Sequence, residues 1–488
     1  MRRTTRRELI VGATATALAS AVPPAYARQH SRRVGVGPGG FADGVATGEP
    51  GSKAITFWSR LRTDHPRSGA KLVVATDSHF KDVVAVTKVP TGRGVNWTLK
   101  TRVGGLEPDQ EYFYLWQSAT AHSEVGRTRT MPVPGSITPL RIGFSSCQHY
   151  CQGYYGAHLD ASRADLGLYL FLGDYIYERG RVPNGVRADG IDAVDLPTYR
   201  RKYQIYRSDE DLRALHRTLP MAHIWDDHEV ENNYSDNNPA PAPAQRIAAY
   251  RAAFEWLPRM VMPSDRFRIY KQLPLGGLAD VFLLDTRQYR TGDDDGLPRH
   301  IMDEAQMQWL INGLKTSRAT WKIVANQVVV AQDPFNTGER GDQWDGYADD
   351  RVRLLGELER AGVRNVVFLT GDAHVFMCNY LASDFQAFAD NRDTQVPAGV
   401  EYVGGSVTSL GGDRPESEVQ AAEAWNQEFN GHDHGYGILS VTPDTLVTEY
   451  RRTDMSVPGG VTQAFERFTQ PSGANRVTRE TLAPSVRT

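Results

Sequence analysis

Residues able to bind metal ions follow several short apolar runs of this sequence. Carboxylates, a thiol, imidazoles and amides occupy these segments, which are 145–148 (Ser-Ser-Cys-Gln), 173–178 (Gly-Asp-Tyr-Ile-Tyr-Glu), 226–229 (Asp-Asp-His-Glu), 326–327 (Asn-Gln) and 370–374 (Thr-Gly-Asp-Ala-His). Crowded carboxylates raise each other's pKa values, and a bound cation removes that repulsion. Carboxylates suit hard cations such as Ca²⁺, whereas imidazole suits iron or zinc and thiolate suits softer metals. The mixed set therefore predicts two or more different metals, and a shared carboxylate would bridge metals roughly 3.5–4 Å apart, as in two-metal hydrolases.

The apolar runs that precede these segments have the pattern of buried strands, and helical patterns lie between them. The expected strands are 141–144, 168–172, 222–225, 280–284, 321–325 and 365–369, and the expected helices are 197–216, 244–257, 303–316 and 349–361. This alternation predicts a layered α/β domain. Ligands bind at the carboxyl ends of the strands in open α/β sheets, so we expect the five metal-binding segments to meet at one edge of one sheet.

An all-β domain is expected ahead of this one, over residues 28–137. Short apolar runs at 54–58, 71–75 and 83–86 alternate with Gly, Pro and Asp turns, which predicts a small β-sandwich. Leu106-Glu107-Pro108 leads into Tyr112, as in the fibronectin III and immunoglobulin-like sandwiches, where a tyrosine braces a corner. Residues 131–135 (Met-Pro-Val-Pro-Gly) predict a linker. The larger domain would then cover 138–460, with late antiparallel strands at 436–441 and 445–450, and 461–488 would form a polar C-terminal tail.

The first 27 residues have the pattern of an export signal. Four arginines precede an apolar run at 9–22, and Ala25-Tyr26-Ala27 matches a small-x-small cleavage site. Residues 5–10 (Thr-Arg-Arg-Glu-Leu-Ile) have the shape of a twin-arginine signal, with an ordinary secretory signal as the alternative. We expect a secreted or cell-envelope protein that crosses the membrane already folded, through the twin-arginine export machinery. No later apolar stretch is long enough to span a bilayer, so we expect no transmembrane segment in the mature chain.

Charge and cysteine content narrow the class of protein further. The formal net charge of −3 gives no indication of specific nucleic-acid binding. The chain has three cysteines, Cys147, Cys151 and Cys378, which is too few for a disulfide framework.

The metal-binding segments resemble the motifs of a known superfamily. Gly-Asp-x-x-Tyr at 173–177, Asp-Asp-His-Glu at 226–229 and Gly-Asp-x-His at 371–374 are similar to those of the calcineurin-like metallophosphatases. The Ser-Cys-Gln start at 146–148 and the segment Gly-Val-Ala-Thr-Gly-Glu-Pro at 44–50 narrow the resemblance to the PhoD-like alkaline phosphatases, over nearly the whole mature chain. This resemblance implies a metallophosphoesterase sandwich of α/β (α+β) type behind the small β-sandwich, together with twin-arginine export. The same family includes some phospholipases D.

The resemblance also implies roles for individual residues. Fe³⁺ would be bound by Cys147, Asp174, Tyr177 and His374. Asp174 would bridge to one or two Ca²⁺ ions, whose further ligands would be Asp227, Asp372 and, on a weaker match, Asn326. Asp372 replaces the first histidine of the superfamily's Gly-His-x-His motif, and a carboxylate suits Ca²⁺ better than Zn²⁺. Mn²⁺ or Zn²⁺ are the less favoured substitutes.

If Cys147 and His374 share a metal, then Cys151 and Cys378, each four residues further on, are also near one another. A disulfide between them is plausible, provided that their Cα atoms lie within roughly 7 Å.

The implied chemistry is attack of a metal-activated hydroxide on phosphorus, in line with the leaving oxygen. Asp226 or Asp227 would be a ligand, and His228 would act as an acid near the leaving group. Arg287 could clamp the phosphate with two hydrogen bonds or, with equal weight, pair with a carboxylate.

The expected function is that of an exported alkaline phosphatase acting on phosphomonoesters and phosphodiesters. One alternative is a phospholipase D that cleaves phospholipid headgroups with the same metal site, which an exposed apolar surface beside the site would favour. The other is a non-catalytic binding protein of the cell surface. That alternative predicts gaps in the ligand set, whereas the main positions are filled.

Overall fold

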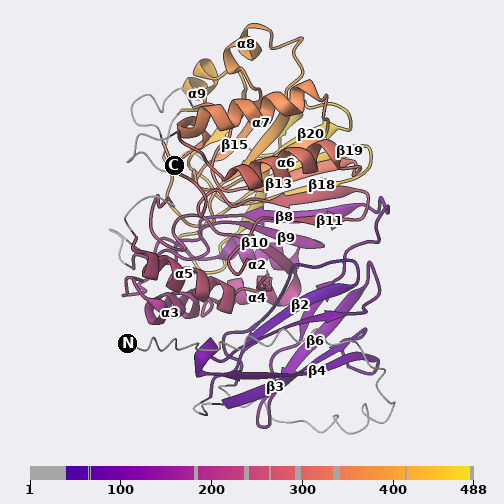
Figure 1. Cartoon of the computed structure of the whole chain (residues 1–488), viewed down its shortest axis with the longest axis vertical. Coiled ribbons are helices and arrows are strands. Elements are labelled where there is room, and N and C mark those ends of the chain that lie inside the picture. Colours follow the sequence, from indigo (N-terminus) through magenta and orange to yellow (C-terminus); the bar gives the residue numbers. More distant parts are fainter. Residues whose placement is uncertain are drawn as a thin grey trace, which may run out of the picture.

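The structure is a computed structural model that describes residues 40–483 except 64, 66, 181–184, 236–240, 263–264, 292–297, 334–340 and 413–414. The predicted export signal at 1–27 therefore lies outside the described residues. A β-sandwich forms one end of the molecule, and an α/β body forms the rest (Figure 1). Among the described helices, none combines the length and the apolar character needed to cross a membrane.

The N-terminal sandwich has two layers of strands. One layer is a four-stranded sheet of β4 (Val83–Gly92), β3 (Arg67–Ala75), β6 (Glu111–Gln117) and β7 (Gly126–Arg129). The other layer consists of β1 (Val45–Gly48), β2 (Ala54–Arg60) and β5 (Thr98–Gly104). Phe57, Leu72 and Trp116 pack in the core between the layers. The backbone N–H of Glu107 donates to Tyr112 Oη at 2.8 Å, so the expected corner tyrosine is present.

The second layer of the sandwich is also the end of a ten-stranded sheet. The order is β21-β20-β19-β18-β8-β9-β10-β1-β2-β5. The additional strands are β8 (Leu140–Ser145), β9 (Leu168–Leu172), β10 (Pro220–Ile224), β18 (His434–Val441), β19 (Thr445–Thr453), β20 (Thr462–Pro471) and β21 (Thr478–Thr481). β1 runs parallel to β10, with Thr47 opposite Pro220. The sandwich and the α/β body are therefore joined by backbone hydrogen bonds as well as by the linker.

A second, seven-stranded sheet has the order β11-β12-β13-β14-β16-β15-β17. Its strands are β11 (Lys271–Leu275), β12 (Ala279–Leu283), β13 (Trp321–Asn326), β14 (Val366–Thr370), β15 (Phe376–Leu381), β16 (Gly399–Gly404) and β17 (Asn426–Asn430). The expectation that all the metal-binding segments end strands of one sheet was therefore wrong. Three of those strands belong to the large sheet and two to this one, because a buried apolar run does not specify which sheet a strand joins.

The two sheets pack against one another, and helices cover their outer faces. One core cluster contains Phe144 and Leu170 of the large sheet together with Val324 and Phe368 of the smaller one. The helices are α2 (Gly156–Arg163), α3 (Leu196–Tyr206), α4 (Glu210–Thr218), α5 (Pro243–Trp256), α6 (Glu304–Thr316), α7 (Ala348–Arg360), α8 (Phe385–Asp390) and α9 (Glu416–Ala422), and short 3-10 turns lie at Arg93–Val95 and Trp344–Tyr347. Figure 1 shows α6 and α7 beside the smaller sheet, and the rings of Trp309 and Phe282 lie 5.8 Å apart.

The expected helix at 197–216 is two helices, α3 and α4. The Asp209 side chain accepts hydrogen bonds from the backbone N–H groups of Asp211 at 2.9 Å and Leu212 at 3.0 Å. Aspartate favours this capping position because its oxygen satisfies amides that lack a partner in the first turn. Asp209 therefore starts a new helix inside one continuous apolar pattern.

Two further expectations need correction. Residues 462–481 are not a tail, because they contain β20 and β21, and Phe465 and Phe468 are buried in the main core. The region looks polar because one face of β20 is partly solvated. The cysteines are buried free thiols. Cys151 contacts Gly180 O at 3.5 Å, while Cys378 lies in β15 opposite Tyr402 of β16, so the disulfide is not formed.

Candidate metal centre

The candidate site lies where the strands of both sheets end. Cys147 follows β8, Asp174 follows β9, and Asp372 and His374 follow β14. These residues have left-handed backbone, with φ angles of 58°, 59°, 60° and 57° respectively. Such angles are unfavourable for residues with a Cβ and cluster at functional sites, where the surroundings enforce them. The turns after three strands thus hold metal-binding side chains in conformations that are locally costly.

The four residues expected at an iron site come together. Donor atoms of Cys147, Asp174 and His374 lie within 4.8 Å of one another. Tyr177 Oη donates to Asp174 Oδ2 at 2.9 Å and lies 3.2 Å from His374 Nε2. His374 Nδ1 is 2.8 Å from the Leu410 carbonyl, which can only accept, so the proton is on Nδ1 and the lone pair is on Nε2. A metal-binding histidine is commonly oriented in this way.

A second group of donors contains only carboxylates. Oxygens of Asp174, Asp226, Asp227 and Asp372 lie within 4.8 Å of one another. Asp174 belongs to both groups, which is the arrangement that a carboxylate bridging two metals requires. Oδ2 of Asp226 is buried without a hydrogen-bond partner, as expected of an oxygen that faces a cation.

The electrostatics of the site also favour bound cations. Burial, together with the neighbouring carboxylates Asp227 and Asp226, raises the pKa of Asp174 well above its usual range. Burial likewise raises the pKa values of the Cys147 thiol and the Tyr177 phenol, and Asp174 adds to both shifts. A bound cation would lower these raised pKa values and so stabilise the ionised forms of the donors. The donor set is therefore suited to metal ions.

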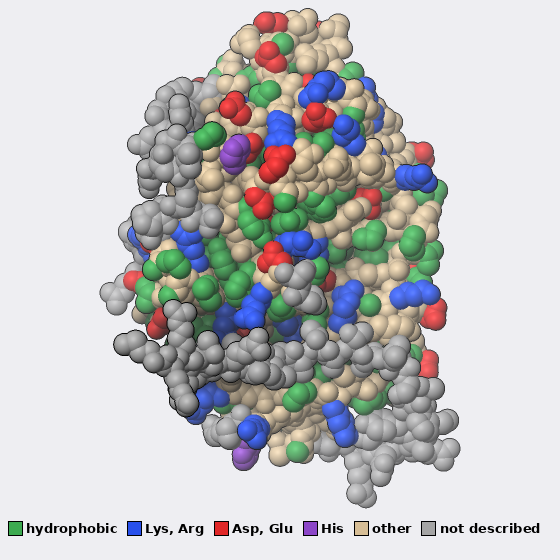
Figure 2. All heavy atoms as spheres, viewed as in Figure 1, with side chains coloured by type: hydrophobic (Ala, Val, Ile, Leu, Met, Phe, Trp, Pro, Cys, Tyr) green, Lys and Arg blue, Asp and Glu red, His purple; other side chains and the backbone are tan. Residues whose placement is uncertain are grey.

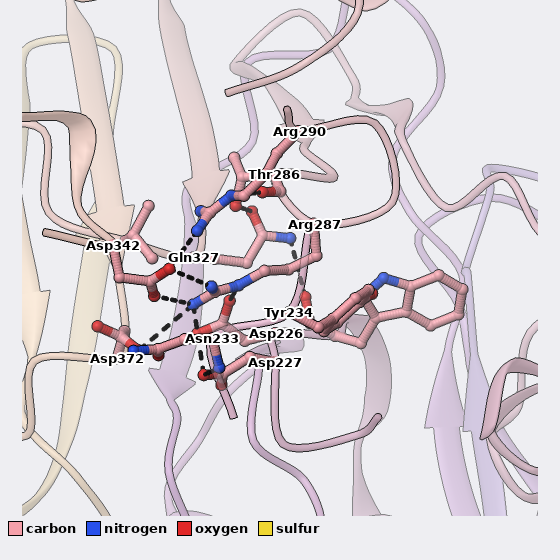
Figure 3. A network of polar contacts seen from close by, with 12 residues as sticks. Asp226, Asp227, Asn233, Tyr234, Thr286, Arg287, Arg290, Gln327, Asp342 and Asp372 are labelled. Carbon is pink, nitrogen blue, oxygen red and sulfur yellow. Dashed lines mark hydrogen bonds and ion pairs between the residues drawn. The ribbon is translucent and has the colours of Figure 1, made fainter. Parts of the chain in front are cut away.

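Arg287 is the centre of the carboxylate network (Figure 3). Its side chain is fully buried, ion-pairs with Asp226, and lies 2.5 Å from Asp342, 3.7 Å from Asp227 and 3.6 Å from Asp372. Arg287 and His228 lower the pKa of Asp227 although burial opposes its ionisation. Of the two roles expected for Arg287, the contacts of this structure show the pairing with carboxylates.

Two of the site residues in the loop before α7 were missed by sequence reasoning. Asp342 accepts hydrogen bonds from Arg287 Nη1 at 2.6 Å and from Arg290. Gln343 donates to the Asp372 carboxylate. Both lie just before the 3-10 turn at Trp344–Tyr347, far along the chain from the end of β13, so no apolar run next to them marked them as site residues.

His228 is held beside the metal-binding residues. Its Nδ1 lies 2.7 Å from Glu178 Oε2, and its ring lies 4.1 Å from that of Tyr177. Carboxylates at Asp227 and Asp174 raise the pKa of His228 well above its usual range, against the effect of burial. Glu178 was missed as a site residue, although it directly follows Tyr177 in the Gly-Asp-Tyr-Ile-Tyr-Glu segment.

Asn326 was also expected as a metal ligand, but its side-chain amide forms hydrogen bonds with other residues of the protein. Its Oδ1 accepts from Trp344 Nε1 at 3.3 Å, and its Nδ2 donates to Thr370 Oγ1 at 3.2 Å. These contacts join the ends of β13 and β14, so Asn326 braces the site in this structure.

Two packed sheets with a metal-ready cluster at their strand ends define a metallophosphoesterase-like fold. A solved structure described as "Structure of PhoD" is similar over 92% of this chain and 93% of that chain, with a TM-score of 0.83 and 31% identity. Purple acid phosphatase PPD1 from yellow lupin (Lupinus luteus) seeds has the same fold at 13% identity, with a TM-score of 0.58 over 86% of this chain and 73% of that chain.

Sequence comparison identifies the family. The sequence model of the PhoD-like phosphatases matches residues 142–450, and that of their N-terminal domain matches residues 27–132. Alkaline phosphatase D of Bacillus subtilis (strain 168) is 31% identical over 494 residues, which cover 92% of this chain and 84% of that protein. The chain belongs to the PhoD-like phosphatase family and is an enzyme, a metal-dependent phosphoric ester hydrolase.

Proposed function

We propose that this protein is an exported alkaline phosphatase that hydrolyses phosphomonoesters and phosphodiesters at a mixed iron–calcium centre. Fe³⁺ would be held by Cys147, Asp174, Tyr177 and His374, and one or two Ca²⁺ ions by Asp174, Asp227 and Asp372. The observation that carries the proposal is that Asp174 belongs to both donor groups, and within each group the donor atoms lie within 4.8 Å of one another.

The donor chemistry supports this assignment of metals. Thiolate and phenolate are anionic and stabilise a trivalent ion, whereas a cluster of carboxylates suits Ca²⁺. Ser409 Oγ donates to Tyr177 Oη at 2.7 Å, which favours the phenolate form of the tyrosine.

The bound metals would supply activation of water and neutralisation of phosphoryl charge. Glu178 holds His228 through Nδ1, so the proton that His228 passes to the leaving oxygen would be on Nε2. Arg287 would offset part of the negative charge of the carboxylate group through its ion pairs with Asp226 and Asp342.

Phospholipase D activity is the second candidate, and Leu410 favours it. This side chain is 56% exposed, and the carbonyl of the same residue contacts His374. An apolar group at the site would suit a phosphoester with an acyl-chain substituent.

Export through a twin-arginine signal is proposed from residues 1–27, where a basic region, an apolar run and a small-x-small site follow one another.

The test measures turnover of p-nitrophenyl phosphate, bis-p-nitrophenyl phosphate and phosphatidylcholine by metal-replete protein, with and without chelator. Chelator-sensitive turnover that favours the small esters supports the proposal, and dominant choline release supports phospholipase D. Asp174→Ala should lose most of its metal and turnover, since it removes a ligand from both groups. An Asp174→Ala protein that kept both would overturn the shared-carboxylate scheme.

A further inference from the structure

The buried side chain of Glu229 bridges the turns that follow β9 and β10. Its Oε2 accepts hydrogen bonds from the backbone N–H groups of Asp174 at 3.1 Å and Asp226 at 2.9 Å. Its Oε1 accepts from the backbone N–H of Tyr175 at 2.7 Å. Glu229 is 1% exposed, so solvent does not compete for these amides.

Glu229 forms this bridge just beyond the point where the backbone pairing of strands β9 and β10 ends. β9 and β10 are parallel neighbours as far as Leu172 and Ile224, and the metal-binding carboxylates come directly afterwards. Gly173 has a φ of 115°, and a Cβ there would lie 2.5 Å from Asp226 Cβ, so the two turns are in close backbone contact. Without Glu229 three buried amides would lose their acceptor, and the left-handed Asp174 would lose its restraint.

We infer that Glu229 is a positioning residue that sets the separation of Asp174 from Asp226 and Asp227, and thereby the affinity of the site for metal. This inference rests on the proposed metal centre. Glu229 acts through the backbone of the ligands, because both of its oxygens already accept hydrogen bonds from backbone amides. Residues that orient ligands in this way typically contribute about 10–100-fold to metal affinity.

The experiment compares Glu229→Gln with wild type. Glutamine has the same shape, but its amide nitrogen must face one of the backbone N–H groups, so at least one hydrogen bond becomes a donor–donor contact. We expect the Ca²⁺ affinity of Glu229→Gln, measured by titration calorimetry on iron-loaded protein, to be at least about tenfold lower than that of wild type. At saturating Ca²⁺, kcat for p-nitrophenyl phosphate should fall while KM stays within about twofold, because ligand spacing changes and substrate contacts do not.

Glu49→Gln is the matched control, since Glu49 is a buried carboxylate that directly follows β1 of the large sheet. Its partners are Lys271, Arg259 and the backbone N–H of Met260, none of which belongs to either donor group. It should change thermal stability without changing Ca²⁺ affinity. Glu229→Asp keeps the carboxyl group but is too short to reach all three amides, so it should also bind Ca²⁺ more weakly. This variant provides the test if Glu229→Gln does not fold.

A folded Glu229→Gln or Glu229→Asp protein with wild-type Ca²⁺ affinity would overturn the inference. Wild-type protein that binds neither metal would instead overturn the proposed metal centre on which the inference rests.

Discussion

The carboxylates around Arg287 carry more negative charge than the neighbouring arginines offset. Arg287 provides one positive charge among Asp226, Asp227, Asp342 and Asp372, and it has no exposed surface. Arg290 adds a second positive charge at Asp342. Two cations do not offset four carboxylates, and burial together with Asp342 and Asp227 leaves the pKa of Asp372 raised even beside Arg287. The remaining negative charge is available for metal ions.

His228 should matter most for poor leaving groups. If its Nε2 protonates the leaving oxygen, His228→Asn should slow hydrolysis of an alkyl phosphate by about 10²–10⁴-fold. Hydrolysis of p-nitrophenyl phosphate should slow much less, because nitrophenolate leaves without a proton. Steady-state kcat values for both substrates measure the difference, with the partly exposed His300 substituted by Asn as the control. Equal losses on both substrates would show that His228 has no acid role.

At the scale of elements, a buried ion pair fastens the segment before α3 to that helix. Lys202 Nζ lies 2.5 Å from Asp189 Oδ2, and neither side chain has exposed surface. Asp192 of the same segment accepts from Gly180 N at 2.9 Å, two residues after Glu178. The pair therefore stabilises the part of the chain that positions Glu178 and His228.

Lys202→Met should lower the free energy of unfolding by about 3–5 kcal/mol, since it leaves Asp189 buried without a partner. Urea unfolding followed by circular dichroism measures this change. Adding Asp189→Leu should recover much of the loss, and Lys315→Met, which removes a solvent-exposed pair with Glu357, should cost less than about 1 kcal/mol. A small effect of Lys202→Met alone would contradict the role of the pair.

Buried histidines between α2, α4 and β10 should make the protein sensitive to acid. Burial lowers the pKa of His158 from 6.5 to about 3, and it lowers the pKa values of His216 and His223 as well. The unfolded chain then binds more protons than the folded one, so stability is present above pH 6.5 and is lost as the pH falls from 6.5 towards 3. His158→Gln should flatten this dependence by up to about 1.4 kcal/mol per pH unit.

Urea unfolding of metal-free protein at several pH values below 6.5 tests this prediction, with the exposed His79→Gln as the control. An unchanged pH dependence in His158→Gln would show that folding does not lower the pKa of this histidine.

At the scale of the whole molecule, the shared sheet should make the sandwich and the α/β body unfold together. β1 pairs with β10, and Trp58 Nε1 of the sandwich donates to Glu255 O of α5 at 2.8 Å. Figure 2 shows acidic and basic side chains side by side in the upper part of the visible face.

Differential scanning calorimetry of the full chain should therefore show one cooperative transition. Removing residues 40–137 should expose the edge of β10 and the apolar surface beneath it, and the remaining fragment should aggregate. Two separated transitions, or a soluble and active fragment beginning near residue 138, would show that the sandwich folds independently.

Local patterns in the sequence were sufficient to predict many of the elements and the main donors. The apolar runs at 168–172 and 321–325 are β9 and most of β13, because a run of buried residues ending in polar ones is a local property. The corner tyrosine, Tyr112, was predicted for the same reason. Helix ends were less certain, since Asp209 interrupts an apolar pattern that continues on both sides.

Tertiary structure decided which of these parts meet. Only the fold brings strand ends from two sheets to one site and places Asp342 and Gln343 beside that site. The fold surrounds Arg287 with carboxylates, and it pairs residues 462–481 as strands of the large sheet. It also places Glu229 between the turns that follow β9 and β10. The sequence by itself determined the donor chemistry and the local elements, because these depend on neighbouring residues. Strand pairing and ion-pair partners depend on the free energy of contacts between residues far apart in the chain, which no local pattern contains.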